Sequence, residues 1–160
     1  MPLIDSHWGQ VFIWDGTSSV ACYNYYTPPF EEGSISNYYC GCVATAYAQF
    51  LRYFRRPVSG LGTGAYEIEV DGVPEIRNLR GGDGNGGPYD WDNMPDLPGS
   101  GTTLAQRQAI GALCYDVGLA AGMSYTAGES GGSLGPTTLM DLFGFSNAII
   151  GRGSSSGLMN

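Results

Sequence analysis

Hydrophobic residues recur at helical spacing in the segment 42–56, CVATAYAQFLRYFRR. The segment is rich in alanine, and its apolar positions follow at intervals of three and four residues: Val43, Ala46, Phe50 and Phe54. This spacing predicts a helix of roughly three turns that ends before Pro57 and turns these four residues toward a core.

Three arginines lie at the end of that predicted helix: Arg52, Arg55 and Arg56. The last turn of a helix carries unpaired carbonyl groups and the negative end of the helix dipole, so cations are favourable there. We interpret the cluster as helix capping, with a site for an acidic ligand as the alternative.

Two further helices are predicted later in the chain. The first begins with Thr102 or Thr103 as N-cap and ends at Gly118. Its apolar positions are Leu104, Ile110, Leu113, Cys114 and Val117. The second is short, begins at Pro136 and ends at Gly144, with Leu139, Met140 and Phe143 as apolar positions.

Alternating residues predict one β-hairpin. Tyr66, Ile68 and Val70 are separated by two glutamates, and the dipeptide Asp71-Gly72 then supplies a two-residue turn. Pro74 restricts the returning strand to a sheet edge because proline cannot donate a ladder hydrogen bond.

The remaining segments predict loops. Residues 1–41 combine many aromatic side chains with proline and glycine, and the run RGGDGNGG at 80–87 lacks the Gly-Lys-Ser/Thr of a nucleotide loop and the acidic spacing of an EF-hand. We therefore interpret 80–87 as a flexible surface loop. With 26 glycines and 9 prolines in 160 residues, the sequence predicts an α+β fold with few helices, a small hairpin and many loops.

Charge excludes some classes of partner. The chain has 15 acidic and 7 basic residues, all of the latter arginines, and a net charge of −8. Such a surface disfavours nucleic acid, and no stretch approaches the roughly 18 apolar residues of a membrane helix. Residues 1–10 also lack the basic start and apolar run of a signal peptide, so we expect a soluble chain.

The four cysteines have different predicted roles. Their spacing does not fit a zinc site, and Cys114 falls on an apolar helix stripe, where it acts as a small hydrophobe. Cys22 and Cys40 are candidates for a disulfide if the protein is exported. Cys42 stands at a helix N-terminus, where unpaired N–H groups favour the thiolate. It is therefore either a nucleophile or a buried small residue.

The segment GCVATAYAQFLRYFRRP at 41–57 resembles the nucleophile segment of the streptopain family of papain-like cysteine peptidases. Other motifs agree in order, so that the resemblance covers about residues 2–150. These motifs are WGQ at 8–10, YNYYTP at 23–28, GLGTGAY at 60–66, YDWDNMP at 89–95, QAIGALCYDVG at 108–118, MSYTAGESGGS at 123–133 and LFGF at 142–145.

This resemblance implies that residues 1–150 form the N-terminal, helical lobe of a papain-like cysteine endopeptidase, followed by a Gly/Ser-rich tail or linker at 151–160. It assigns Cys42 as nucleophile and Gln10 as the oxyanion-hole side chain, acting with the Cys42 backbone N–H. Substrate-binding roles fall to Gly41, Ser130, Gly131 and Gly132. It further implies protein or peptide substrates, no metal or organic cofactor, and a secreted or cell-envelope location.

The chain departs from the family in one respect that concerns catalysis. The family's catalytic histidine follows a later Gly-Gly pair and precedes tryptophan-rich strands, and this segment is absent. The single histidine, His7, stands three residues before Gln10 and is expected to be exposed. A base is thus expected from a second lobe or chain. The alternative is a non-catalytic binding or assembly module in which Cys42 is a relic.

The run GESGGS at 128–133 also resembles the nucleophile loop of chymotrypsin-like serine peptidases. Those enzymes need His, Asp and Ser in that chain order across two barrels, which neither His7 nor the helix at 42 fits. We therefore do not favour a serine nucleophile.

Overall fold

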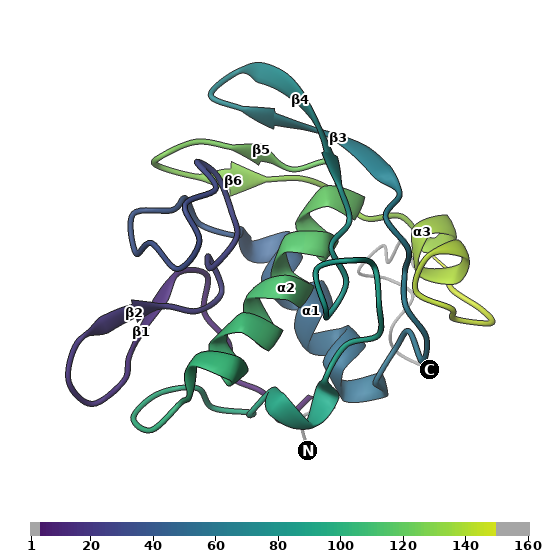
Figure 1. The fold of residues 1–160 in the computed structure, drawn as a ribbon. Helices are drawn as coiled ribbons and strands as arrows, with labels where there is room; N and C mark the ends of the chain where they lie inside the picture. Colours follow the sequence, from purple (N-terminus) through teal and green to yellow (C-terminus); the bar gives the residue numbers. More distant parts are fainter. Residues whose placement is uncertain (1–3, 150–160) are drawn as a thin grey trace, which may run out of the picture.

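The computed structural model describes residues 4–149, in which two helices, α1 (Cys42–Phe54) and α2 (Leu104–Ala120), pack against each other under a small sheet (Figure 1). The mixture of helices and short strands agrees with the predicted α+β class. Along α2, every residue from Ile110 to Leu119 is buried, so this helix runs through the centre of the core. No helix among the described residues is long and apolar enough to cross a membrane.

The helix α1 begins where the sequence predicted, but it buries a different face. Its buried residues are Ala44, Thr45, Ala48 and Leu51. Of the predicted stripe, Val43 and Phe50 are half-buried, and Ala46 and Phe54 are exposed. The predicted stripe is therefore wrong for Ala46 and Phe54, whereas Val43 and Phe50 pack against the edge of the core. The small side chains of the buried face let α1 approach α2 closely.

The helix α2 starts with the predicted threonine cap. The Thr103 side chain accepts a hydrogen bond from Gln106 N, and the Gln106 side chain accepts one from Thr103 N, which is a capping box. The helix continues past Gly118 to Ala120, so Gly118 does not end it as predicted. Gly118 instead leaves room for the hydroxyl of Tyr125, which a β-carbon there would overlap.

The predicted hairpin is present as β3 (Ala65–Val70) and β4 (Val73–Asn78). Asp71 and Gly72 form its turn with φ of 50° and 80°, the left-handed conformation that a two-residue hairpin turn requires. The sheet order is β4-β3-β5-β6, with β5 (Ser124–Tyr125) parallel to β3 and β6 (Ser130–Gly131) antiparallel to β5. The strand with Pro74 is an edge strand, as predicted.

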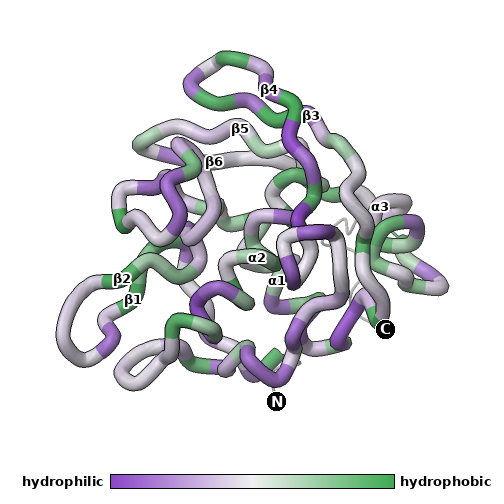
Figure 2. Tube along the Cα trace, in the orientation of Figure 1, coloured by the Kyte–Doolittle hydropathy of each residue, from purple (hydrophilic) through white to green (hydrophobic). Residues whose placement is uncertain are grey.

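The entry segment contains a second hairpin that the sequence analysis missed. Its strands are β1 (Phe12–Trp14) and β2 (Ser19–Ala21), and Figure 2 shows hydrophobic stretches in this hairpin joined by a loop of pale to hydrophilic colour. The turn is closed by Asp15, whose carboxylate accepts hydrogen bonds from Thr17 N and Ser18 N at 2.8 and 3.0 Å.

The glycine-rich segment 80–87 is a surface loop, but it is held in place by hydrogen bonds. Asp83 accepts from Asn85 N and Gly87 N, each at 2.8 Å, and Gly86 N donates to Arg80 O at 2.8 Å. The prediction of a surface loop is confirmed, and these bonds close the loop on itself.

The C-terminal part of the described chain contains η1 (Trp91–Asn93), a 3₁₀ turn before α2, and α3 (Pro136–Asp141) after the sheet. Proline at the start of α3 was predicted, whereas the helix ends three residues before Gly144. Phe143 is fully buried beyond the helix end. The predicted tail at 151–160 lies outside the described residues.

Candidate active site

Cys42 is the first residue of α1, and the backbone geometry of the preceding position, 41, requires glycine. Gly41 has φ +90° and is buried. A β-carbon on it would overlap the Met123 side chain and lie 2.9 Å from Ser130 O. Only glycine combines a positive φ with the absence of a β-carbon. Gly41 is buried, whereas the side chain of the next residue, Cys42, is exposed.

The other three cysteines are buried and unreactive by environment. Cys22, Cys40 and Cys114 have no exposed surface, whereas Cys42 is exposed. Burial raises the pKa of Cys22 to about 12, and contact with the Cys40 thiol together with burial raises the pKa of Cys114. The prediction that Cys114 is structural is confirmed, and of the two interpretations of Cys42 the buried small residue is wrong.

The predicted disulfide between Cys22 and Cys40 is wrong for this structure, because both are free thiols. The Cys40 sulfur lies instead 3.3 Å from the hydroxyl of Thr45.

Alkylation should therefore select Cys42. We expect iodoacetamide at neutral pH to label it about tenfold or more faster than any other cysteine, since Cys42 is exposed and the other three thiols are buried. Peptide mapping by mass spectrometry measures the distribution. A Cys42→Ser variant should take up no label until urea exposes the buried thiols, and preferential labelling of Cys114 in the native protein would contradict the prediction.

Cys42 and Gln10 open into one groove of about 440 Å³. Gln10 precedes β1 and is half-buried. Its backbone carbonyl oxygen accepts a hydrogen bond from Cys40 N at 2.9 Å. The groove is lined by Trp8, Gly9, Gln10, Val11, Tyr39, Cys42, Thr45, Ala46 and Gln49. The structure thus brings together the two residues that the resemblance assigns to bond cleavage.

The loop at 128–133 meets the start of α1 through Ser130, which packs against Gly41. Ser130 and Gly131 form β6 and also line a separate pocket of about 300 Å³, while Gly132 packs against Met123. The predicted substrate-binding residues are therefore neighbours of the Cys42 helix terminus. The Ser130 hydroxyl is buried and has no hydrogen-bond partner among the described residues, so nothing there activates it as a nucleophile.

His7 is exposed, as predicted, and is not among the residues that line the groove. Its backbone N–H donates to Asp96 O at 2.8 Å, which holds the His7 backbone beside Asp96. Trp8 is buried and donates its indole N–H to Pro95 O at 3.0 Å, so its side chain packs in the core.

Sequence reasoning missed two polar residues of the groove, Thr45 and Gln49. Both lie on α1, three and seven residues after Cys42, so they share the face of the helix that Cys42 begins. That spacing is the signal that could have identified them.

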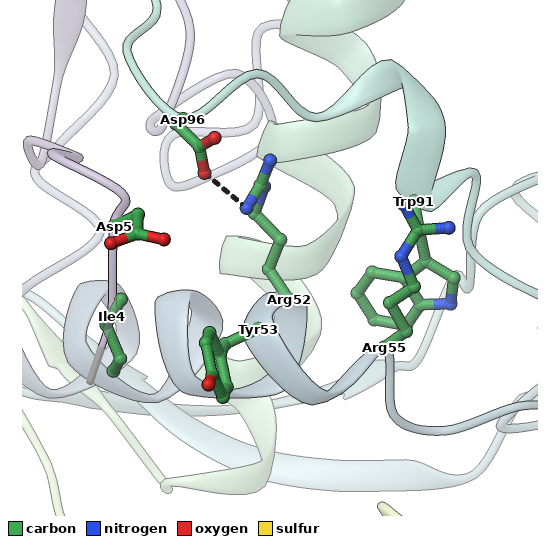
Figure 3. A pocket seen from close by; sticks show the side chains of 7 residues that line it. All are labelled: Ile4, Asp5, Arg52, Tyr53, Arg55, Trp91 and Asp96. Carbon is green, nitrogen blue, oxygen red and sulfur yellow. Dashed lines mark ion pairs between the residues drawn. The ribbon is translucent and has the colours of Figure 1, made fainter.

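The arginines lie at the end of α1, as predicted: Arg52 is in the last turn, and Arg55 is the C-cap residue in a left-handed conformation. The backbone N–H groups of Arg55 and Arg56 donate to Arg52 O at 3.1 Å and to Leu51 O at 3.0 Å. Arg52 pairs with Asp96 at 2.5 Å and Arg55 with Asp92 at 2.9 Å. Figure 3 shows Arg52 directed at Asp96 in a polar pocket of about 150 Å³. The capping interpretation therefore holds for Arg52, in the last turn, and for Arg55, at the C-cap. The ion pairs of these two arginines also tie α1 to the segment around η1.

The model of the Peptidase C10 family matches residues 14–157, which is most of the chain. This chain belongs to the Peptidase C10 family. Streptopain of Streptococcus pyogenes serotype M1 is 29% identical over 147 residues, covering 84% of this chain and 37% of the relative. Another Streptococcus pyogenes streptopain is 28% identical over 138 residues, which are 79% of this chain and 34% of that relative. The resemblance to the streptopain family is thereby confirmed.

Two solved structures from Prevotella intermedia have similar folds. Active wild-type interpain A cysteine protease has 30% sequence identity and a TM-score of 0.66, with 89% of this chain and 54% of that chain covered. A fragment of prointerpain A, in a cysteine-to-alanine mutant, has 29% identity and a TM-score of 0.61, with 89% and 42% covered. The papain-like fold is confirmed, and this C10 chain spans about a third to a half of the length of these relatives.

Proposed function

We propose that this C10 chain carries the nucleophile of a cysteine endopeptidase, with Cys42 as the attacking thiol. The observation that supports this most strongly is the exposed thiol at the start of α1 in the same groove as Gln10. The Cys42 backbone N–H belongs to the first turn, whose N–H groups have no acceptor inside the helix. Together with the Gln10 side-chain amide it would donate to the oxyanion of the tetrahedral intermediate.

The proposed reaction needs a base that the described residues do not bring to the groove. An imidazole takes the Cys42 proton, and the thiolate attacks the substrate carbonyl carbon to form the tetrahedral oxyanion. The imidazolium then protonates the leaving amine as the peptide bond breaks, and water hydrolyses the acyl-enzyme and restores the thiol. We assign the imidazole to a second lobe or chain, because His7 does not line the groove.

The outer side of α1 supports the proposal of such a second lobe. Ala46, Tyr47 and Phe50 of α1 line an apolar depression of about 260 Å³ together with Ile4 and Leu139, and Phe54 further along is 44% exposed. Contiguous exposed apolar surface of this kind marks interaction sites. The backbone groups of 130–132 would bind the extended substrate, and the whole protein would be exported, in keeping with its acidic, lysine-free composition.

The test is hydrolysis of unfolded casein by the protein prepared together with its histidine-bearing lobe. Cys42→Ala should abolish cleavage, and Gln10→Ala should lower kcat by about 10²–10³-fold, the cost of removing one oxyanion donor. Cys114→Ala, a buried cysteine away from the groove, is the matched control and should retain activity once shown to be folded.

The alternative function, a binding or assembly module, predicts a different result. The protein with its partner would bind casein without cleaving it, and Cys42→Ala would bind equally well. That outcome would overturn the peptidase proposal.

A further inference from the structure

Thr45 connects the helix that carries Cys42 to the segment that carries Gln10. The Thr45 hydroxyl donates to Gly9 O at 3.0 Å and lies 3.3 Å from the Cys40 sulfur. A hydroxyl has one hydrogen to donate, and Gly9 O receives it. The contact with the Cys40 sulfur is a second polar contact of the same hydroxyl.

A second bond runs in parallel with this one. The backbone N–H of Cys40 donates to Gln10 O at 2.9 Å, so the carbonyl groups of Gly9 and Gln10 are both held by residues flanking Cys42. Thr45 is 7% exposed, and a hydrogen bond in such a place is costly to leave unmade. The backbone on both sides of the Gln10 α-carbon is thus fixed relative to the start of α1.

Gln49 extends the same arrangement by one further turn of α1. Its side-chain oxygen accepts hydrogen bonds from Trp8 N and from the Ser6 hydroxyl, each at 3.1 Å. Its amide nitrogen donates to Thr45 O at 3.3 Å. One face of α1 therefore holds the chain from Ser6 to Gln10, with Thr45 nearest to the thiol.

We infer that Thr45 is a positioning residue for the oxyanion hole, an inference that rests on the proposed peptidase function. The two proposed donors, the Gln10 amide and the Cys42 N–H, come from segments far apart in the sequence. Such donors work only when they are held within about half an ångström of the productive geometry. Thr45 supplies this restraint through the hydrogen bond from its hydroxyl to Gly9 O.

The test compares Thr45→Val, which keeps the shape but removes the hydroxyl, with Thr45→Ser, which keeps the hydroxyl. In the protein with its histidine-bearing lobe, Thr45→Val should lower kcat on a peptide amide about tenfold. This is less than the 10²–10³-fold loss of kcat expected when the Gln10 amide itself is removed. Its KM should change little, and Thr45→Ser should recover most of the activity. Alkylation of Cys42 by iodoacetamide forms no oxyanion, so its rate should stay within about twofold in all variants.

A double-mutant cycle separates positioning from a general structural effect. In a Gln10→Ala background the Thr45→Val change should cost almost nothing more, because the donor that it positions is already gone. Additive losses, or equal losses of hydrolysis and alkylation in folded Thr45→Val, would overturn the inference. If Gln10→Ala itself leaves hydrolysis unchanged, the oxyanion role and the inference both fail. An effect of Gln10→Ala without one of Thr45→Val overturns the inference alone.

Discussion

Replacing Asp116 with alanine is expected to lower the free energy of unfolding by about 3–5 kcal/mol. Asp116 lies in the middle of α2 with no exposed surface, and its carboxylate accepts three hydrogen bonds. The donors are Arg80 N and Gly81 N, each at 2.8 Å, and the Tyr89 hydroxyl at 2.5 Å. Alanine would leave all three donors without this acceptor and detach the 80–89 segment from the core.

Urea unfolding measures this loss, with Asp83→Ala as the matched control. Asp83 also accepts two backbone N–H bonds in the same loop, but it is exposed, so water can replace it at a cost of about 1 kcal/mol or less. Equal losses in the two variants would contradict the role assigned to Asp116. Where the alanine variant fails to fold, Asp116→Asn serves instead, since it retains one carbonyl oxygen for Arg80 N.

The same carboxylate should make stability depend on pH. Burial raises the pKa of Asp116 to about 6, although the hydrogen bonds from Tyr89, Arg80 N and Gly81 N lower it. Because the folded state then binds this proton more tightly than the unfolded state, the stabilisation is fully present below pH of about 4. It is lost as pH rises to about 6, by roughly 3 kcal/mol in total.

Asp116→Asn isolates this dependence because asparagine does not titrate. As pH rises from 4 to about 6.5, the free energy of unfolding of the wild type should fall relative to that of Asp116→Asn. Above about pH 6.5 the difference between the two proteins should stay constant. The exposed Asp15 and Asp83, whose pKa values are lowered by backbone hydrogen bonds, are common to both proteins and cancel. A difference that is constant over this range would contradict the assignment.

The sequence predicted where α1 begins but not which face it buries, and the reason is physical. Phe50 and Phe54 recur at helical spacing, but so do Ala44, Ala48 and Leu51, and periodicity alone cannot rank the two stripes. Close packing of α1 on α2 selected the small residues, a tertiary effect. The strands β1 and β2 were missed because each has only three residues, too few for alternation to show.

Two residues of the candidate site were predictable, one from local chemistry and one from a family motif. Cys42 follows from its place at a helix start and Gln10 from its motif. Thr45 and Gln49 carried no motif, and their importance arises only when the chain folds the Ser6–Gln10 segment back along α1. The Asp116 network was likewise invisible, since its partners Arg80 and Tyr89 lie about thirty residues away in the sequence.

The isolated chain of 160 residues is expected to show no measurable peptidase activity. The mechanism requires an imidazole within hydrogen-bond reach of the Cys42 sulfur, the sequence contains one histidine, and His7 is exposed and does not line the groove. Without a base both thiol activation and protonation of the leaving amine fail, which should slow cleavage by at least about 10³-fold.

Casein hydrolysis by the purified chain, with and without the histidine-bearing lobe, measures this loss. His7→Ala should leave casein hydrolysis by both preparations unchanged, because the His7 imidazole has no role in the reaction. Cys42→Ala should abolish casein hydrolysis by the protein with its histidine-bearing lobe. Cleavage by the chain alone that disappears in His7→Ala would instead make His7 the base.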